Sequence, residues 1–431
     1  MVNHVSSDPV ADFAAFLQDS PTSYHAVEAM AARLDAGGFV RQREEDAFDG
    51  TPGGHYIVRD GALIAYRLPA GVSEQTCLRI VGAHTDSPAF KLKPLPEHRR
   101  DGYAQAGAEV YGGPLLNSWL DRDLAVAGRV VLRDGSMRLV RSPAWLRIPQ
   151  LAVHLDRSVN DALHLDPQAH LMPVYGLDGG PAVADGGLLG AVARLAGLAS
   201  SEEIAGHDLF LVTTEAPAVL GVAGEFLASR RLDNLSSVWA GLTALLAVEP
   251  PGPGAPIPVL ACFDHEEVGS SSRSGAAGPF LACVVERILL ALGITGDDVP
   301  RCWARSWFVS SDTGHAVNPN YPGKSDPDER PVLNGGPMLK VNARHGYTTE
   351  GPGESMWRRA CEAGDVPVQV FVSSNDVPCG STIGPFVEAR LGVRTVDVGV
   401  PILSMHSARE LVGTDDPARF ARAFGAFFVL A

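Results

Sequence analysis

The chain has 431 residues, 45% of them hydrophobic, and a formal net charge of −15 at pH 7. This length is enough for two domains with buried cores, and the negative charge argues against nucleic acids and anionic membranes as partners. No apolar run approaches the ~20 residues that cross a bilayer. Residues 1–10 lack the charged and apolar regions of a signal peptide. We therefore expect a cytoplasmic protein.

The cysteine pattern agrees with this expectation. The six cysteines lie far apart and form no CxxC pair. Such spacing predicts buried thiols, neither a disulfide framework nor a cysteine zinc site. They are Cys77, Cys262, Cys283, Cys302, Cys361 and Cys379.

The beginning of the chain predicts helices followed by strands. An apolar stripe around Phe16 indicates a first helix, and the capping sequence 20–23 introduces a second one over 24–34. Strands are predicted at 62–68 and 78–83. The second is almost entirely apolar, which is typical of a central strand.

The middle of the chain has a different residue pattern. Glycine and proline separate short β-like pieces, and little helical periodicity is present before Leu188. The predicted strands there are 129–132, 137–140 and 151–155. We therefore predict a β-rich domain, residues 93–218, inserted into a domain formed by residues 1–92 and 219–431.

After Asp233 helices and strands alternate. The predicted helices are 235–246, 280–292 and 383–391, and the predicted strands are 257–263, 307–309, 368–372 and 396–398. This alternation favours a parallel or mixed sheet with helices on both faces. The predicted fold class is therefore α/β, a mixed sheet flanked by helices, with the β-rich insertion.

Acidic and imidazole side chains follow several of these strands. Ligands of open α/β sheets bind beyond the carboxyl ends of the strands, so we expect these loops to converge on one edge. A His-X-Asp or Glu-Glu sequence is weak evidence by itself, because acidic groups are usually solvated. Their joint occurrence after strands favours a site. The residues are His84, Asp86, Asp233, Glu266, Glu267, Asp312, His315 and His406.

Two histidines and several carboxylates without a thiolate suit a pair of zinc ions, with cobalt or manganese as substitutes. A shared carboxylate can bridge two ions ~3.5–4 Å apart. In the Glu266-Glu267 doublet one carboxylate can bind metal while the other accepts a proton from water. Asp86 can orient the imidazole of His84 through its second nitrogen.

Ordered motifs run through nearly the whole chain. They include VGAHTDSP at 81–88, RLDNL at 231–235, EEVGS at 266–270, NDVPCGSTIGP at 375–385 and MHSARE at 405–410. In these motifs the chain resembles the M18 metallopeptidases, the aspartyl aminopeptidases. The resemblance implies a two-zinc enzyme that removes N-terminal aspartate, and then glutamate, from peptides.

The resemblance also implies a role for each matching position. One zinc is bound by His84 and Asp312, the other by Glu267 and His406, and Asp233 bridges them. Glu266 takes the position of the general base, with Asp86 behind His84.

Further positions match contacts with the substrate. They are His315, Lys340 and Tyr347, and His154, which matches a histidine that reaches the site of a neighbouring subunit. We expect Lys340 to pair with the acidic side chain of the substrate. The resemblance further implies a tetrahedral homo-dodecamer built from dimers, with the inserted domain mediating dimer contacts.

Two alternatives remain open at this point. A related two-zinc deacylase or carboxypeptidase would need an arginine for the substrate carboxylate, and Arg344 and Arg409 are candidates. A non-catalytic peptide-binding assembly would be favoured by a lost ligand or base, but every expected position is filled.

Overall fold

The computed structural model describes residues 8–430, which form two compact units. The first contains residues 8–86, 217–405 and 410–430, and the second contains residues 87–216 and 406–409. The second unit thus takes in a short segment, 406–409, that lies far outside the predicted insertion. None of the helices in residues 8–430 combines the length and apolar character that a membrane span requires.

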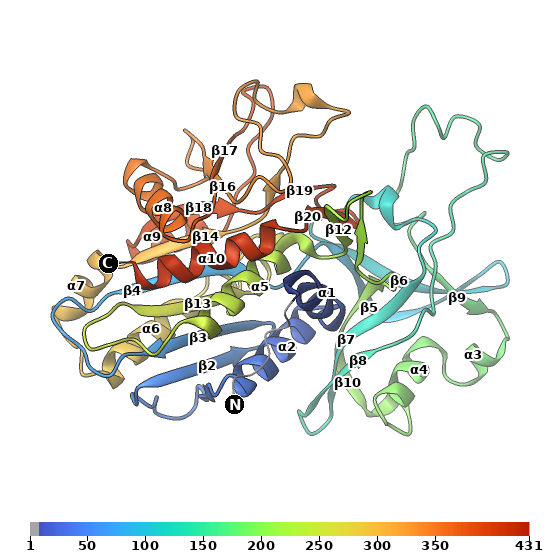
Figure 1. The fold of residues 1–431 in the computed structure, drawn as a ribbon. Helices are drawn as coiled ribbons and strands as arrows, with labels where there is room; N and C mark the ends of the chain where they lie inside the picture. The colour runs from blue at the N-terminus through green and yellow to red at the C-terminus, as the bar shows by residue number, and fades with distance from the viewer. Residues whose placement is uncertain (1–7, 431) are drawn as a thin grey trace. The chain divides into compact units, whose positions relative to one another are not determined.

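A nine-stranded mixed sheet organises the first unit (Figure 1). Its four central strands are parallel to one another, and the outer strands include both parallel and antiparallel pairs. The strands, in spatial order, are β1 (Val40–Arg41), β2 (Gly53–Arg59), β3 (Ala62–Leu68), β13 (Ile257–Phe263), β4 (Leu78–His84), β14 (Trp307–Ser311), β18 (Arg394–Gly399), β16 (Met338–Val341) and β17 (Gln369–Val372).

Helices cover both faces of this sheet. One apolar core lies under α1 (Pro9–Asp19), α2 (Ser23–Ala36), α5 (Leu232–Ala247), α8 (Gly351–Ala363) and α10 (Asp416–Val429). A second core lies under α6 (Phe280–Ala291), α7 (Asp298–Arg305) and α9 (Gly384–Leu391). A sheet buried on both faces needs apolar central strands, and every residue of β4 and β13 is buried.

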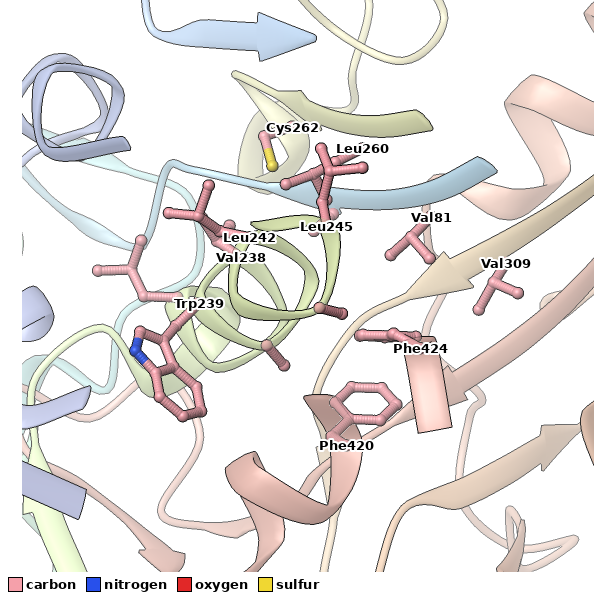
Figure 2. Packing of buried hydrophobic residues seen from close by; sticks show 14 of the residues in the cluster. Val81, Val238, Trp239, Leu242, Leu245, Leu260, Cys262, Val309, Phe420 and Phe424 are labelled. Carbon is pink, nitrogen blue, oxygen red and sulfur yellow. The ribbon is translucent and has the colours of Figure 1, made fainter. Parts of the chain in front are cut away.

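Helix α5 is central to the first of these cores. Its Leu245 lies near Leu260 of β13, while Phe420 and Phe424 of α10 lie on the other side of the cluster (Figure 2). This helix begins with the RLDNL motif. Close packing therefore holds Asp233, in its first turn, against the sheet.

A smaller five-stranded sheet completes the first unit. Its strands are β11 (Ala218–Leu220), β12 (Phe226–Ser229), β20 (Glu410–Gly413), β19 (Pro401–Leu403) and β15 (Gly314–His315).

The second unit is built on a six-stranded antiparallel sheet. Its strands are β8 (Met137–Arg141), β7 (Leu124–Leu132), β10 (Ile204–Thr213), β5 (Ala89–Arg100), β6 (Tyr103–Tyr111) and β9 (Val174–Leu177), and its helices are α3 (Pro181–Ala184) and α4 (Gly187–Leu195).

The predicted α/β fold class is confirmed, and strands β3 and β13 have the predicted bounds. The predicted strand 151–155 is wrong. Those residues form turns, and the apolar side chains that suggested the strand are exposed: Leu151 at 57% and Leu155 at 74%. The prediction of buried thiols also fails for Cys283, which lies on the outer face of α6, and Cys379 is only half-buried.

Candidate metal centre

The chemistry-bearing residues of the first unit follow its central parallel strands. His84 is the last residue of β4, Glu267 lies in a 3₁₀ turn (Glu266–Val268) after β13, and Asp312 follows β14. Strands β13, β4 and β14 are adjacent, so their carboxyl ends meet at one edge of the sheet. Asp233 enters the same place from the first turn of α5.

These side chains form a cluster in which His84 and Asp233 are buried and Glu267 and Asp312 are half-buried. Nε2 of His84 lies 3.4 Å from Oδ1 of Asp233 and 3.4 Å from Oδ1 of Asp312. One ligand atom each from His84, Asp233 and Glu267 lie within 4.8 Å of one another. These three donors come from the ends of β4 and β13 and from the first turn of α5.

The donor set fits zinc in chemistry and in spacing. Imidazole and carboxylate are both zinc ligands, and two atoms bound ~2.0–2.1 Å from a tetrahedral ion lie about 3.4 Å apart. Both distances from Nε2 of His84 have this value.

Asp86 contacts both His84 and the Glu266-Glu267 doublet. Nδ1 of His84 lies 3.1 Å from the backbone carbonyl oxygen of Asp86 and 3.4 Å from its Oδ1. Both contacts favour a proton on Nδ1 and leave Nε2 to face the carboxylates. The same carboxylate accepts the backbone N–H groups of Glu266 and Glu267, each at 3.1 Å. Asp86 therefore positions both the histidine and the glutamate doublet.

The concentration of buried carboxylates perturbs their ionisation. Burial, together with repulsion from Asp312 and Asp233, raises the pKa of Glu266 to about 8. Burial and the charge of Asp233 raise the pKa of Glu267 well above its ordinary value. Burial alone would lower the pKa of His84, but the surrounding aspartates outweigh it and raise the pKa. A divalent cation would relieve this repulsion.

Further contacts fix Asp233, and the motifs did not assign them. Its backbone N–H donates to Oε2 of Glu410 at 3.0 Å, and the side-chain amide of Asn234 donates to the carbonyl of Ser311 at 2.8 Å. The guanidinium of Arg231 donates to the carbonyls of Ser20 and Thr85. Arg231 and Glu410 belong to the RLDNL and MHSARE motifs, so the motifs could have drawn attention to both.

Lys340 lies beneath the cluster rather than in solvent. Its ammonium donates to the carbonyl of Thr313 at 2.6 Å, lies 3.8 Å from Oδ2 of Asp312, and stands 5.2 Å from the centre of the Tyr347 ring. The side chain is buried. Lys340 therefore connects Asp312 to Tyr347.

His315 and Tyr347 line a pocket of about 400 Å³ in the first unit. The ring of Phe371 lies 6.2 Å from each of them. The walls of the pocket also include Tyr321, Lys324, Val377, Pro378, Gly380, Ile402 and Leu403. Three of the predicted substrate positions, Lys340 included, are thus at this pocket or next to it.

The remaining two predicted positions belong to the second unit. Nδ1 of His406 lies 3.0 Å from the carbonyl oxygen of Gly113. This contact leaves Nε2 as the ring nitrogen that can bind a metal. His154 is exposed and lies in the turns that follow Gln150.

A mixed sheet with imidazole and carboxylate donors at its parallel strand ends is typical of a metal-dependent hydrolase. Comparison with known proteins then gives the family. Residues 16–428 match the family model of aminopeptidase I zinc metalloproteases, M18. A probable M18 family aminopeptidase 2 of Streptomyces coelicolor is 52% identical over 419 residues, which is 96% of each chain.

Solved structures of similar proteins share the fold. Ape4, in the cryo-EM structure of its complex with Nbr1, is 35% identical with a TM-score of 0.91, over 97% of this chain and 85% of that one. The S. cerevisiae mApe1 dodecamer is 29% identical with a TM-score of 0.83, over 99% and 97%. The chain belongs to the M18 family of zinc metallo-aminopeptidases, as the sequence predicted.

Proposed function

We propose that the protein uses two zinc ions to remove N-terminal acidic residues from peptides, aspartate before glutamate. The observation that carries this proposal is the cluster of His84, Asp233, Glu267 and Asp312, buried or half-buried at the sheet edge, in a chain of this family. In the proposed assignment His84 and Asp312 hold one ion, Glu267 and His406 hold the other, and Asp233 bridges. Cobalt or manganese would be acceptable substitutes.

Bound zinc would polarise the scissile carbonyl and lower the pKa of water. The chain's own residues supply the proton transfers. Glu266 lies beside the cluster, and Asp86 fixes its backbone. Glu266 would accept the proton of the attacking water and pass it to the leaving amine, the role of a general base and then a general acid. His315 would donate a hydrogen bond to the oxyanion.

An acidic substrate side chain needs a cation, since the whole chain is strongly negative. Lys340 supplies one next to the predicted substrate positions, through its contacts with Thr313, Asp312 and Tyr347. The proposal requires the substrate carboxylate to compete for this ammonium, or to be held through the pocket that Tyr347 lines.

We further propose a homo-oligomer, a tetrahedral dodecamer built from dimers, in which His154 reaches the site of a neighbouring subunit. The mApe1 relative is described as a dodecamer. The exposed apolar side chains of Leu151 and Leu155 flank His154 in sequence, and such side chains favour a protein contact. The mass of the assembly in solution tests this part of the proposal.

The substrate proposal is tested with chromogenic amides of Asp, Glu, Leu and Lys. It requires kcat/KM to be highest for Asp, with Glu second. A preference for Leu or Lys would leave the protein an M18 aminopeptidase but would overturn the acidic specificity. Adding N-acylated amino acids and C-terminal peptide substrates separates the aminopeptidase from a deacylase or carboxypeptidase.

A further inference from the structure

A buried carboxylate outside the candidate metal centre contacts two loops that contribute residues to the pocket. Asp397, in the middle of the central strand β18, is 0% exposed. Its Oδ2 accepts both the backbone N–H and the hydroxyl of Thr348, at 2.6 and 2.7 Å, and its Oδ1 accepts the hydroxyl of Thr382 at 2.6 Å. All three bonds are at the short end of the range for protein hydrogen bonds.

These bonds join two separate loops. Residues 342–350 connect β16 to α8 and carry Tyr347, directly before Thr348. Residues 373–383 connect β17 to α9 and carry Val377, Pro378 and Gly380, which line the pocket. Both loops are therefore tied to one side chain of the sheet beneath them.

The two loops also touch each other above Asp397. A Cβ at Gly346 would lie 2.9 Å from the carbonyl oxygen of Gly380 and 3.3 Å from Sγ of Cys379. A Cβ at Gly384 would lie 2.7 Å from Oδ2 of Asp397. The space around this junction is filled, so a shift of one loop must move the other.

We propose that Asp397 is a positioning residue, which sets the two walls of the substrate pocket relative to each other. Its carboxylate holds Thr348 and Thr382, and these hold Tyr347 and the Val377–Gly380 segment. This inference rests on the proposed use of the pocket for the peptide. It adds a determinant of substrate binding that touches neither the metal centre nor the substrate.

Asp397→Ala and Asp397→Asn separate the hydrogen bonds from the charge. The asparagine keeps an oxygen that can accept both bonds from Thr348, and its amide can donate to the hydroxyl of Thr382. The alanine loses every bond and leaves a buried N–H without an acceptor. Thr382→Val keeps the shape and removes the bond to Asp397, together with the longer bonds that this hydroxyl accepts from Gly384 at 3.3 Å and Ser310 at 3.4 Å. It remains informative should Asp397→Ala not fold.

Asp416→Ala is the matched control for a general loss of stability. Asp416 is also 0% exposed, and it accepts the N–H groups of Asn334 and Gly336 at 2.6 and 3.0 Å. It ties residues 334–336, none of which lines the pocket in the part of the chain that the structure describes.

Steady-state kinetics, zinc content and thermal unfolding are measured for all four variants, on whichever amide the wild type hydrolyses best. A misplaced binding group commonly costs up to ~100-fold. We expect Asp397→Ala to raise KM about tenfold or more with zinc retained, Thr382→Val to raise it less, and Asp397→Asn to stay near wild type. Asp416→Ala should lower the unfolding temperature without raising KM.

Equal KM values in Thr382→Val and Asp416→Ala, or loss of zinc from Asp397→Asn, would overturn the proposal. The wild-type amide profile tests the acidic specificity independently, because the KM ratios are taken on any amide that is cleaved. A wild-type preference for Leu amides would therefore overturn the proposed acidic specificity, while the comparison of the Asp397 variants would remain valid.

Discussion

The side chains of Asp86 and His84 lie against each other, with 3.4 Å between Oδ1 of Asp86 and Nδ1 of His84. Because the same carboxylate accepts the backbone N–H of Glu266 and of Glu267, it fixes the histidine and the glutamate doublet relative to each other. A ligand of the candidate metal centre and the candidate general base thus depend on one side chain, and each can be tested separately.

Asp86→Ala should weaken zinc binding and lower kcat together. Loss of a group that orients a metal-binding histidine typically costs ~10–100-fold in metal affinity or activity. Zinc dissociation constants from competition with a chelator, measured beside kcat, check this. Unchanged affinity with lower kcat would mean that Asp86 serves the Glu266–Glu267 turn alone.

Glu266→Gln should keep zinc and lose turnover, whereas Glu267→Gln should lose zinc. Removing a general base costs ~10²–10⁴-fold in rate, while removing a ligand empties the metal site. The two changes are matched, since each replaces one carboxylate of the same 3₁₀ turn by an amide. Near-normal activity in Glu266→Gln together with full zinc in Glu267→Gln would mean that the two roles are misassigned.

Lys340→Ala should lower kcat/KM for Asp amides far more than for Leu amides. Losing one partner of a partly buried charge pair costs ~2–5 kcal/mol. Lys340→Met keeps the apolar length of the side chain and controls for packing. Lys340 also contacts Thr313 and Asp312, so its loss could instead affect the metal centre and lower activity on every substrate. An equal loss on both amides would mean that Lys340 positions Asp312 and does not select the substrate.

His154→Ala should assemble and bind zinc but lose activity. Mixed with inactive Glu266→Gln subunits under exchange, it should recover part of that activity, because one site of a mixed dimer then has both an intact base and a donated histidine. Mass spectrometry of the mixture establishes the exchange. No recovery despite exchange, or a fully active monomer, would mean that His154 acts only within its own chain or has no role in catalysis.

Several elements could be predicted from the sequence because local patterns determine them. The apolar runs of β3 and β13 are buried on both faces, and the predicted bounds match. His84, Glu267 and Asp312 each follow a predicted strand, and their position at one sheet edge could be predicted because parallel strands bring their carboxyl ends together. The apolar residues around His154 led to a wrong strand prediction. Their side chains are exposed, and residues 151–155 pair with no strand in the described part of the chain, residues 8–430.

The contacts beneath the pocket could not be predicted from the sequence. Asp397 lies in a largely buried strand, and its partners Thr348 and Thr382 are 49 and 15 residues away. No local periodicity relates such positions. Lys340 presents the same difficulty, because a lysine in a short strand gives no sign that its ammonium is buried against Thr313.

Zinc content per subunit, compared between the wild type and Asp233→Ala, tests the account most directly, because one bridging carboxylate should serve both ions. We predict two zinc ions per wild-type subunit and the loss of both in Asp233→Ala, with aminopeptidase activity lost in parallel. One zinc ion in the wild type, or zinc content and activity that survive in Asp233→Ala, would contradict the proposed two-zinc centre.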